Sequence, residues 1–270
     1  MEVDKRLTEN FIYYKDTNIA FYQYGNPKGK AVVWLHGFLE DSRMWKYLID
    51  DLPVSLRHIF IDLPGFGNSQ CIAYVHTMEE MAEVVMRVLK ELKVKKAALI
   101  GHSMGGYVAL AFGEKYPETV RSMCLLHSTA AADTPEKIQN RNRGIELAKK
   151  NSELFAKTTF KGLFADWAHE QFAELIDEQA EIAGKTVVQG IVAALEGMKI
   201  RPDRTVLLHF APFEIYHIAG DEDPVFKGQS LLEQFQAPKV RSYIIKAGHM
   251  SHIENRPELL KVLREFFKSL

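Results

Sequence analysis

Cysteine is scarce in this chain, and long apolar runs are missing. Of the 270 residues only two are cysteine, Cys71 and Cys124. Two cysteines are too few for the disulfide framework of a small secreted domain, and their spacing fits no zinc-binding pattern. No stretch approaches the roughly 18 apolar residues that a bilayer-spanning helix needs. We therefore expect no disulfide scaffold, no zinc finger and no membrane span.

An excess of charge of either sign is also missing. The chain carries 34 Lys and Arg against 35 Asp and Glu, a formal net charge of -1. It thus lacks the basic patch that nucleic acid or an anionic membrane would attract. Residues 1–6 are charged but no apolar run follows them, so they do not form a secretory signal. We expect a cytoplasmic protein with no nucleic-acid partner; oligomeric state is left open.

What the chain does contain is a regular alternation of strand and helix patterns. After an alternating hairpin pattern over 11–24, joined through a polar turn at 16–18, short apolar runs recur between segments of helical periodicity. Continuous apolar runs are typical of strands buried on both faces, and their alternation with helices predicts βαβ units and a mostly parallel sheet. These runs cover residues 31–35, 58–61, 97–100 and 122–127.

The alternation is interrupted once, between residues 130 and 205. This stretch reads as charged helical segments with no clear strand, and the strand pattern resumes at 213–218 and 240–245. A helix is also expected over about 225–235. Because the block interrupts one alternation, we predict a core of residues 1–129 and 206–270 with an inserted helical lid at 130–205.

A serine between glycines is the central motif. Gly101-His102-Ser103-Met104-Gly105-Gly106 follows the apolar run 97–100 and precedes a helical pattern over 107–116. This is the nucleophile-elbow pattern, in which a tight turn pushes a hydroxyl out of the sheet. Residues without a Cβ prevent collisions between strand, turn and helix. The bare motif is only moderately specific, so the residues elsewhere in the chain decide whether Ser103 is a nucleophile.

Serine alone is a poor nucleophile at neutral pH and needs a base together with a group that orients the base. Candidate acids Asp221, Glu222 and Asp223 follow the strand pattern 213–218, and His249 follows the strand pattern 240–245. The order serine, acid, histidine fits a hydrolase arrangement on an α/β sheet. His252 competes with His249, which stands directly after its strand and a glycine.

Five motifs in order give the chain a resemblance to a known family. Together they resemble the α/β-hydrolase superfamily, in the group with a single lid domain. The resemblance implies a three-layer sandwich with a mostly parallel, roughly eight-stranded sheet. The motifs are His36-Gly37-Phe38, the loop 62–69, the elbow 101–106, Gly220-Asp221-Glu222-Asp223, and Gly248-His249 with Glu254 and Pro257 downstream.

The resemblance implies a role for each member of the site. Ser103 would attack an acyl carbonyl, His249 would take and return the proton, and the acid would be Asp223, the third residue after its glycine. Asp221 is the nearest rival, and Asp133 is a remote one because some family members carry their acid after the preceding strand.

Two backbone N–H groups would stabilise the oxyanion that forms on attack. The N–H of Met104 stands at the start of a helix, where N–H groups are unpaired and the dipole favours an anion. The second donor would be the N–H of Phe38, whose side chain would form the floor of the pocket.

Other histidines are given supporting roles. We expect His36 to order the oxyanion loop, His102 to line the elbow, and His252 with Glu254 to shape the loop that carries the base. The remaining histidines show no ligand-like grouping, so neither a metal site nor a cofactor is expected. They are His58, His76, His127, His169, His209 and His217.

The substrate pocket is the least defined part of the prediction. Aromatic side chains of the lid region and its surroundings could line it, and the candidates are Trp45, Phe155, Phe160, Phe164 and Trp167. The expected activity is a serine hydrolase acting on a small or medium apolar ester, thioester or lactone. Carbon-carbon bond hydrolase and perhydrolase activities use the same triad, and a non-enzymatic ligand receptor on this fold is the alternative from another class.

Overall fold

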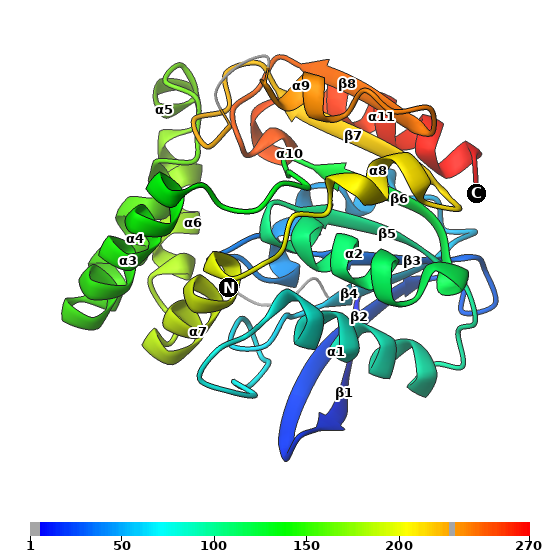
Figure 1. The fold of residues 1–270 in the computed structure, drawn as a ribbon, viewed down its shortest axis with the longest axis horizontal. Coiled ribbons are helices and arrows are strands. Elements are labelled where there is room, and N and C mark those ends of the chain that lie inside the picture. The colour runs from blue at the N-terminus through cyan, green and yellow to red at the C-terminus, as the bar shows by residue number, and fades with distance from the viewer. Residues whose placement is uncertain (1–5, 227–229) are drawn as a thin grey trace.

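An eight-stranded sheet forms the centre of the computed structural model, which describes residues 6–226 and 230–270. Its strand order is β1-β2-β4-β3-β5-β6-β7-β8 (Figure 1). Two short stretches, 1–5 and 227–229, lie outside the described residues. The expectation about a secretory signal rests on the first, and the second falls within the helix expected at 225–235.

The sheet is parallel except at one edge. β1 pairs antiparallel with β2 and β2 antiparallel with β4, whereas each later pair is parallel. The mostly parallel, eight-stranded sheet predicted from the sequence is therefore confirmed. The strands are β1 (Thr8–Tyr14), β2 (Thr17–Gly25), β3 (Ala31–Leu35), β4 (Arg57–Ile61), β5 (Ala97–His102), β6 (Val120–Leu126), β7 (Glu214–Gly220) and β8 (Val240–Ile245).

The hairpin between β1 and β2 is tighter than predicted. The expected turn at 16–18 is wrong, because Thr17 and Asn18 already pair with Tyr14 and Tyr13. The turn consists of Lys15 and Asp16, whose φ angles are 46° and 60°. Two successive positive φ angles match the right-handed twist of paired strands and allow a two-residue connection.

Side chains alternate between the two faces of the sheet and so create two apolar layers. On β3, Val33 and Leu35 join one core cluster, whereas Val32 and Trp34 join the other. This period of two is the geometry of a pleated strand. The helices that cover the first face are α1 (Met78–Glu91) and α2 (Met104–Lys115), and those on the second face are η1 (Ser42–Tyr47) and α11 (Arg256–Lys268).

The start of α1 shows half of a capping box. Thr77 Oγ1 accepts a hydrogen bond from the backbone N–H of Glu80 at 3.1 Å, which satisfies one unpaired donor of the first turn. The Glu80 carboxylate does not return to Thr77, as a full box requires. It pairs instead with Lys15 Nζ in the β1–β2 turn at 2.6 Å, because the turn lies within its reach.

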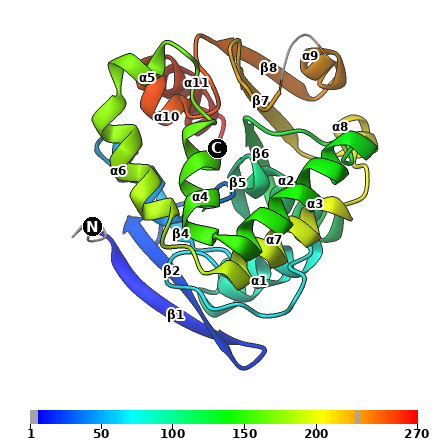
Figure 2. The same ribbon diagram turned by 90° about the vertical axis from the view of Figure 1, so that its left-hand side faces the viewer.

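Helices fill the connection between β6 and β7, as the strand-free sequence pattern predicts. The helices from α3 to α7, which we call the helical segment, lie together beside the sheet (Figures 1 and 2). The connection contains α3 (Pro135–Lys150), α4 (Ser152–Lys161), α5 (Ala168–Gln171), α6 (Ala173–Ala183), α7 (Val188–Lys199) and α8 (Thr205–Phe210). The remaining short elements are η2 (Ile49–Asp51), η3 (Pro117–Thr119), α9 (Ser230–Gln234) and α10 (Ser251–Glu254).

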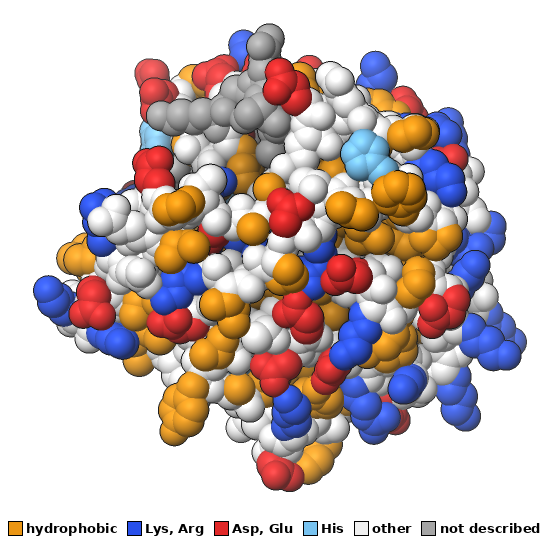
Figure 3. Space-filling view, in the orientation of Figure 1, with side chains coloured by type: hydrophobic (Ala, Val, Ile, Leu, Met, Phe, Trp, Pro, Cys, Tyr) orange, Lys and Arg blue, Asp and Glu red, His pale blue; other side chains and the backbone are white. Residues whose placement is uncertain are grey.

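The surface agrees with the balanced composition. Figure 3 shows positive and negative side chains interspersed on one face of the molecule, with apolar side chains scattered among them. Among the described residues, no helix is both long enough and apolar enough to cross a bilayer.

We expect Gly105→Ala to lower the free energy of unfolding by about 1–3 kcal/mol, the usual cost of forcing extra atoms into a packed site. A Cβ on Gly105 would lie 2.2 Å from the carbonyl oxygen of Leu35, and the backbone of a central strand cannot yield. Urea unfolding measures the change. Gly162→Ala is the matched control, since its nearest neighbour atom would be 3.5 Å away. Equal stability of the two variants would contradict the close approach of α2 to β3.

Candidate active site

Ser103 occupies a strained turn between β5 and α2. Its φ of 51° and ψ of -113° lie in a region that side-chain-bearing residues rarely adopt. Neighbouring strands hold this conformation, since Ser103 N donates to Leu126 O at 2.9 Å and Ser128 Oγ donates to Ser103 O at 2.8 Å. Strain that surrounding contacts maintain is typical of functional positions.

Glycine is required where the strand meets the helix of this turn. A Cβ on Gly101 would stand 2.4 Å from the carbonyl oxygen of Gly105. The end of β5 and the start of α2 are therefore closer than any larger residue permits, which gives the glycines of the motif a steric reason.

Ser103 and His249 both line a cavity of about 400 Å³. One wall comes from residues that follow the carboxyl ends of β3, β5 and β8, and the other from α3, α4 and α7 of the helical segment. A larger hollow of about 620 Å³ near the β1–β2 turn includes none of the predicted catalytic residues, so size alone does not locate the site. The first cavity is lined by Phe38, Glu40, His102, Ser103, Tyr107, Lys137, Asn140, Arg141, Gly144, Phe155, Thr159, Leu163, Leu195, Met198, Val225 and His249.

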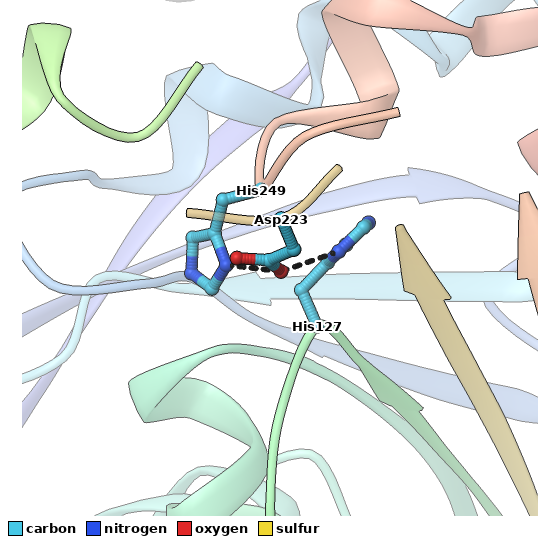
Figure 4. Close-up of side chains that lie close together, drawn as sticks. All are labelled: His127, Asp223 and His249. Carbon is cyan, nitrogen blue, oxygen red and sulfur yellow. Dashed lines mark hydrogen bonds and ion pairs between the residues drawn. The ribbon is translucent and has the colours of Figure 1, made fainter. Parts of the chain in front are cut away.

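Asp223 binds two histidines through one carboxylate oxygen (Figure 4). His249 Nδ1 lies 2.8 Å and His127 Nδ1 lies 3.1 Å from Asp223 Oδ2. The other oxygen, Oδ1, accepts from the backbone N–H groups of Val225 and Phe226 at 2.8 and 3.2 Å. Each carboxylate oxygen of Asp223 thus accepts two hydrogen bonds. These contacts fix the orientation of the carboxylate and of the His249 ring.

The electrostatics of this group keep the carboxylate ionised. Burial alone would raise the pKa of Asp223, but the attraction of His249 and the hydrogen bonds from both histidines outweigh it, so the pKa falls well below its ordinary value. For His127 burial is the dominant effect, and it lowers the pKa of the ring to about 4. His127 Nε2 lies 2.7 Å from Ser251 Oγ, so a neutral ring can donate from Nδ1 and accept at Nε2.

The backbone of His249 is held on both sides. Its N–H donates to Leu163 O in the helical segment at 3.0 Å, and its carbonyl accepts from His102 Nε2 at 2.9 Å.

Among the described residues no hydrogen bond joins Ser103 Oγ to His249. Catalytic hydrogen bonds are often long in proteins without substrate, and the two side chains share one cavity wall.

His102 is held between two acceptors, an arrangement that favours its charged form. Its Nδ1 faces Glu40 Oε2 at 2.8 Å, and its Nε2 faces the carbonyl of His249. Only an imidazolium carries a proton on both nitrogens, so both contacts require the charged ring. Burial opposes the charge of His102, but Glu40 and these hydrogen bonds outweigh burial and raise its pKa above 6.5.

The loop after β3 presents one of the expected oxyanion donors. In the described part of the chain, the N–H groups of Phe38 and Met104 have no hydrogen-bond acceptor. His36 Nε2 accepts from Leu63 N at 2.8 Å, so its Nδ1 carries the proton that Gly37 O accepts, also at 2.8 Å. These contacts order the loop, the role that the sequence predicts for His36.

The rival acids lie elsewhere. Asp221 Oδ1 accepts from the N–H of Ala247 at 3.1 Å. Asp133 is bound by two arginines, pairing with Arg141 and, at 2.7 Å, with Arg201 Nη1. Of the carboxylates that the sequence offers, Asp223 is the one brought to His249.

The rival base is enclosed on the opposite side of Glu40. His252 Nε2 lies 3.9 Å from Glu40 Oε1, and burial lowers the pKa of His252 to about 3. Its ring does not line the cavity of Ser103. Glu254 holds the loop after β8 by accepting from Ala165 N at 2.8 Å and Met250 N at 2.9 Å, which is the structural role expected of it.

Of the aromatic side chains predicted for the pocket, Phe38 and Phe155 line it, whereas Trp45, Phe160, Phe164 and Trp167 do not. Trp45 is fully buried in the second core cluster, where its ring meets Trp34 edge to face with centroids 4.9 Å apart. Phe164 and Trp167 pack in the first cluster instead. Phe155 and Thr159, four residues apart, form the face of α4 toward the cavity, whereas Phe164 lies beyond the end of this helix at Lys161.

The expectation that His127 belongs to no ligand-like group is wrong. His127, Asp223 and His249 offer ligand atoms within 4.8 Å of one another, a set that could hold a metal ion. The contacts of 2.8 and 3.1 Å between the histidine nitrogens and the carboxylate oxygen are hydrogen-bond lengths. In the observed geometry the group is hydrogen-bonded.

Sequence reasoning missed His127 although a signal was present. His127 directly follows β6, just as the acid and His249 follow β7 and β8. Parallel strands end at one edge of a sheet, so a polar residue directly after each strand belongs to the same neighbourhood. Glu40 was missed for another reason, since nothing near it in sequence indicates that it pairs with His102, 62 residues away.

Comparison with known proteins agrees with the fold. Residues 30–256 match the model of the alpha/beta hydrolase fold family, and the chain belongs to this family. It is 27% identical over 256 residues to the 2-succinyl-6-hydroxy-2,4-cyclohexadiene-1-carboxylate synthase of Citrobacter koseri, covering 90% of this chain and 96% of that protein.

Solved structures extend the similarity over the whole chain. A thermophilic esterase from Thermogutta terrifontis, with malate bound, superposes with a TM-score of 0.89 at 29% identity, covering 97% of this chain and 98% of the other. The enol-lactonase of Burkholderia xenovorans LB400 superposes with a TM-score of 0.88 at 18% identity, covering 96% and 100%, and shares the fold.

We expect His102 to be an imidazolium at neutral pH while His127 stays neutral down to about pH 4. Because the pKa of His102 is raised, its contribution to stability is present below about pH 6.5 and is lost as pH rises through the folded pKa. Histidine-selective ¹⁵N NMR across a pH titration measures the protonation state of both rings. Glu40→Gln removes the charge that raises the pKa of His102 and should lower it. A His102 ring that is neutral at pH 6 in the unmodified protein would contradict the assignment.

Proposed function

We propose that the protein is a serine hydrolase with Ser103 as nucleophile, His249 as general base and Asp223 as orienting acid. The observation that carries the proposal is the 2.8 Å contact of Asp223 Oδ2 with His249 Nδ1 beside a cavity that Ser103 also lines. A base held through Nδ1 has its Nε2 available for a serine hydroxyl, which is the arrangement that activates serine.

The reaction follows from these positions. Ser103 Oγ attacks the acyl carbonyl as its proton passes to His249 Nε2, and the negative charge of Asp223 stabilises the imidazolium. The carbonyl oxygen becomes an anion that the N–H groups of Phe38 and Met104 are free to bind; loss of one such donor typically costs about 3 kcal/mol. His249 then protonates the leaving alcohol, and a water molecule hydrolyses the acyl-enzyme by the same steps.

The substrate we propose is a small or medium ester, thioester or lactone. Apolar side chains of the helical segment supply much of the cavity wall opposite Ser103. They are Phe155, Leu163, Leu195 and Met198. We therefore propose residues 130–205 as a lid over a catalytic core of 1–129 and 206–270, in which the core performs the chemistry and the lid selects the acyl group.

Chemistry at a carbon-carbon bond is the second candidate. The similarity to a 2-succinyl-6-hydroxy-2,4-cyclohexadiene-1-carboxylate synthase extends over 90% of the chain, and the same triad can serve such reactions. A non-enzymatic receptor on this fold would keep the cavity and lose turnover. Turnover of esters by the purified protein separates these possibilities.

We expect a fluorophosphonate probe to label the folded protein at Ser103, with the site identified by mass spectrometry. Ser103→Ala should abolish labelling, and Asp223→Asn should reduce the rate of p-nitrophenyl butyrate hydrolysis by about 10³–10⁴-fold because the base loses its orientation. Ser242→Ala, at an exposed position of β8, is a control that leaves the nucleophile and its turn in place. A folded protein that neither takes label nor hydrolyses any ester would refute the hydrolase proposal.

We expect His249→Ala and His252→Ala to have very different effects on kcat. Loss of the base should reduce kcat by at least about 10³-fold, whereas His252 lies outside the cavity of Ser103 and its loss should act mainly on stability. Steady-state kinetics and thermal unfolding of both variants separate these effects. Full activity in His249→Ala together with loss in His252→Ala would reverse the assignment of the base.

A further inference from the structure

One wall of the cavity carries more positive charge than the protein itself neutralises. Lys137, Asn140, Arg141 and Gly144 line it at the spacing of a single face of α3. Arg141 pairs with the carboxylate of Asp133, and Arg201 Nη1 lies 2.7 Å from Oδ1 of the same carboxylate.

The carboxylate of Asp133 thus pairs with two arginines, and the ammonium group of Lys137 is left without a carboxylate. Among the described residues Lys137 Nζ has no carboxylate partner. It lies 4.7 Å from the centre of the Phe226 ring, and that ring lies 5.8 Å from the ring of His249. Two successive contacts therefore connect the ammonium group to the proposed base, so both face the same small space.

The position of Lys137 is unfavourable for the folded protein alone. It stands in the first turn of α3, where the helix dipole favours anions and disfavours cations. Burial is the main cause that lowers its pKa, and the charges of Arg201 and Arg141 lower the pKa further. The charges of Asp133 and Asp223 oppose this shift without cancelling it. An anion bound beside Lys137 would relieve each of these costs.

We propose that the natural substrate carries a carboxylate and that Lys137 binds it at the α3 wall of the cavity. The inference rests on the proposed function and refines it: the reacting ester lies at Ser103, and the apolar side chains of the cavity cover the carbon chain between the ester and the anion. The substrate class is therefore the half-ester of a dicarboxylic acid, or an ester whose alcohol part bears the carboxylate.

The test compares anionic and neutral esters of matched length. Monomethyl succinate, glutarate and adipate are paired with methyl butyrate, valerate and hexanoate, and 6-acetoxyhexanoate is paired with hexyl acetate. Release of methanol, or of acetate for the second pair, gives the kcat/KM of each ester. The preference ratio is the kcat/KM of the anionic ester divided by that of its neutral partner. We expect a ratio above one in at least one pair, and a lower ratio at high salt because screening weakens the attraction.

Lys137→Met should reduce the preference ratio about tenfold, the loss expected for one charge-assisted hydrogen bond. Lys137→Glu should reverse the preference, and Lys137→Arg should keep most of it. Lys150→Met is the matched control, since Lys150 is exposed at the far end of the same helix and should leave the ratio unchanged. A ratio at or below one in every pair, or a ratio that Lys137→Met does not change, would overturn the proposal.

Binding to Ser103→Ala separates this proposal from the hydrolase proposal. Calorimetry with monomethyl adipate and methyl hexanoate needs no turnover and should show tighter binding of the half-ester, lost when Lys137→Met is added. If that preference is present and the unmodified protein hydrolyses nothing, the hydrolase proposal fails and the carboxylate site stands. If esters are hydrolysed without any anionic preference in rate or binding, the carboxylate site fails alone.

Discussion

The ionised carboxylate of Asp223 is the constraint on which the rest of the site depends. An isolated charge buried in a protein is very unfavourable, and it is tolerated only when hydrogen bonds and opposite charge replace water on every side. Here His249, His127 and the N–H groups of Val225 and Phe226 supply those contacts. Satisfying one buried group therefore fixes the loops after β6, β7 and β8 relative to one another.

A second buried charge pair connects this group to the nucleophile side of the cavity. His102 joins the carbonyl of His249 to Glu40, and Glu40 Oε2 also accepts from Gly37 N at 3.1 Å. The contacts run from the loop after β8, through the residue beside Ser103, to the loop that carries Phe38. Since buried charges are costly to leave unpaired, each loop has little freedom to move without the others. The positions that the proposed chemistry requires are thus parts of one network.

In the proposed function, chemistry and recognition belong to different parts of the molecule. The network above belongs to the sheet and its loops, whereas the helical segment supplies the wall that faces Ser103 from the other side. That wall combines apolar side chains with a cationic stripe on α3, and it touches the catalytic side through Leu163 O, which accepts from His249 N. Helical segments can change their side chains without disturbing the buried charges, so one arrangement can serve many substrates.

The sequence alone determined the alternation of strands and helices, the elbow at Ser103 and the order of acid and histidine, because these depend on periodicity and on residues adjacent in the chain. Residue pattern alone offered Asp221, Glu222, Asp223 and Asp133 as acids, since all follow strands, and the family resemblance selected Asp223.

Only the tertiary structure decided which carboxylate meets His249, brought in His127 and Glu40, and moved Trp45 from the pocket to the core. Each of these depends on side chains from strands far apart in sequence that end at one edge of the sheet, or on which face of a helix turns inward. Local patterns give the elements, but long-range packing sets the distances between their side chains, and the chemistry proposed here depends on those distances.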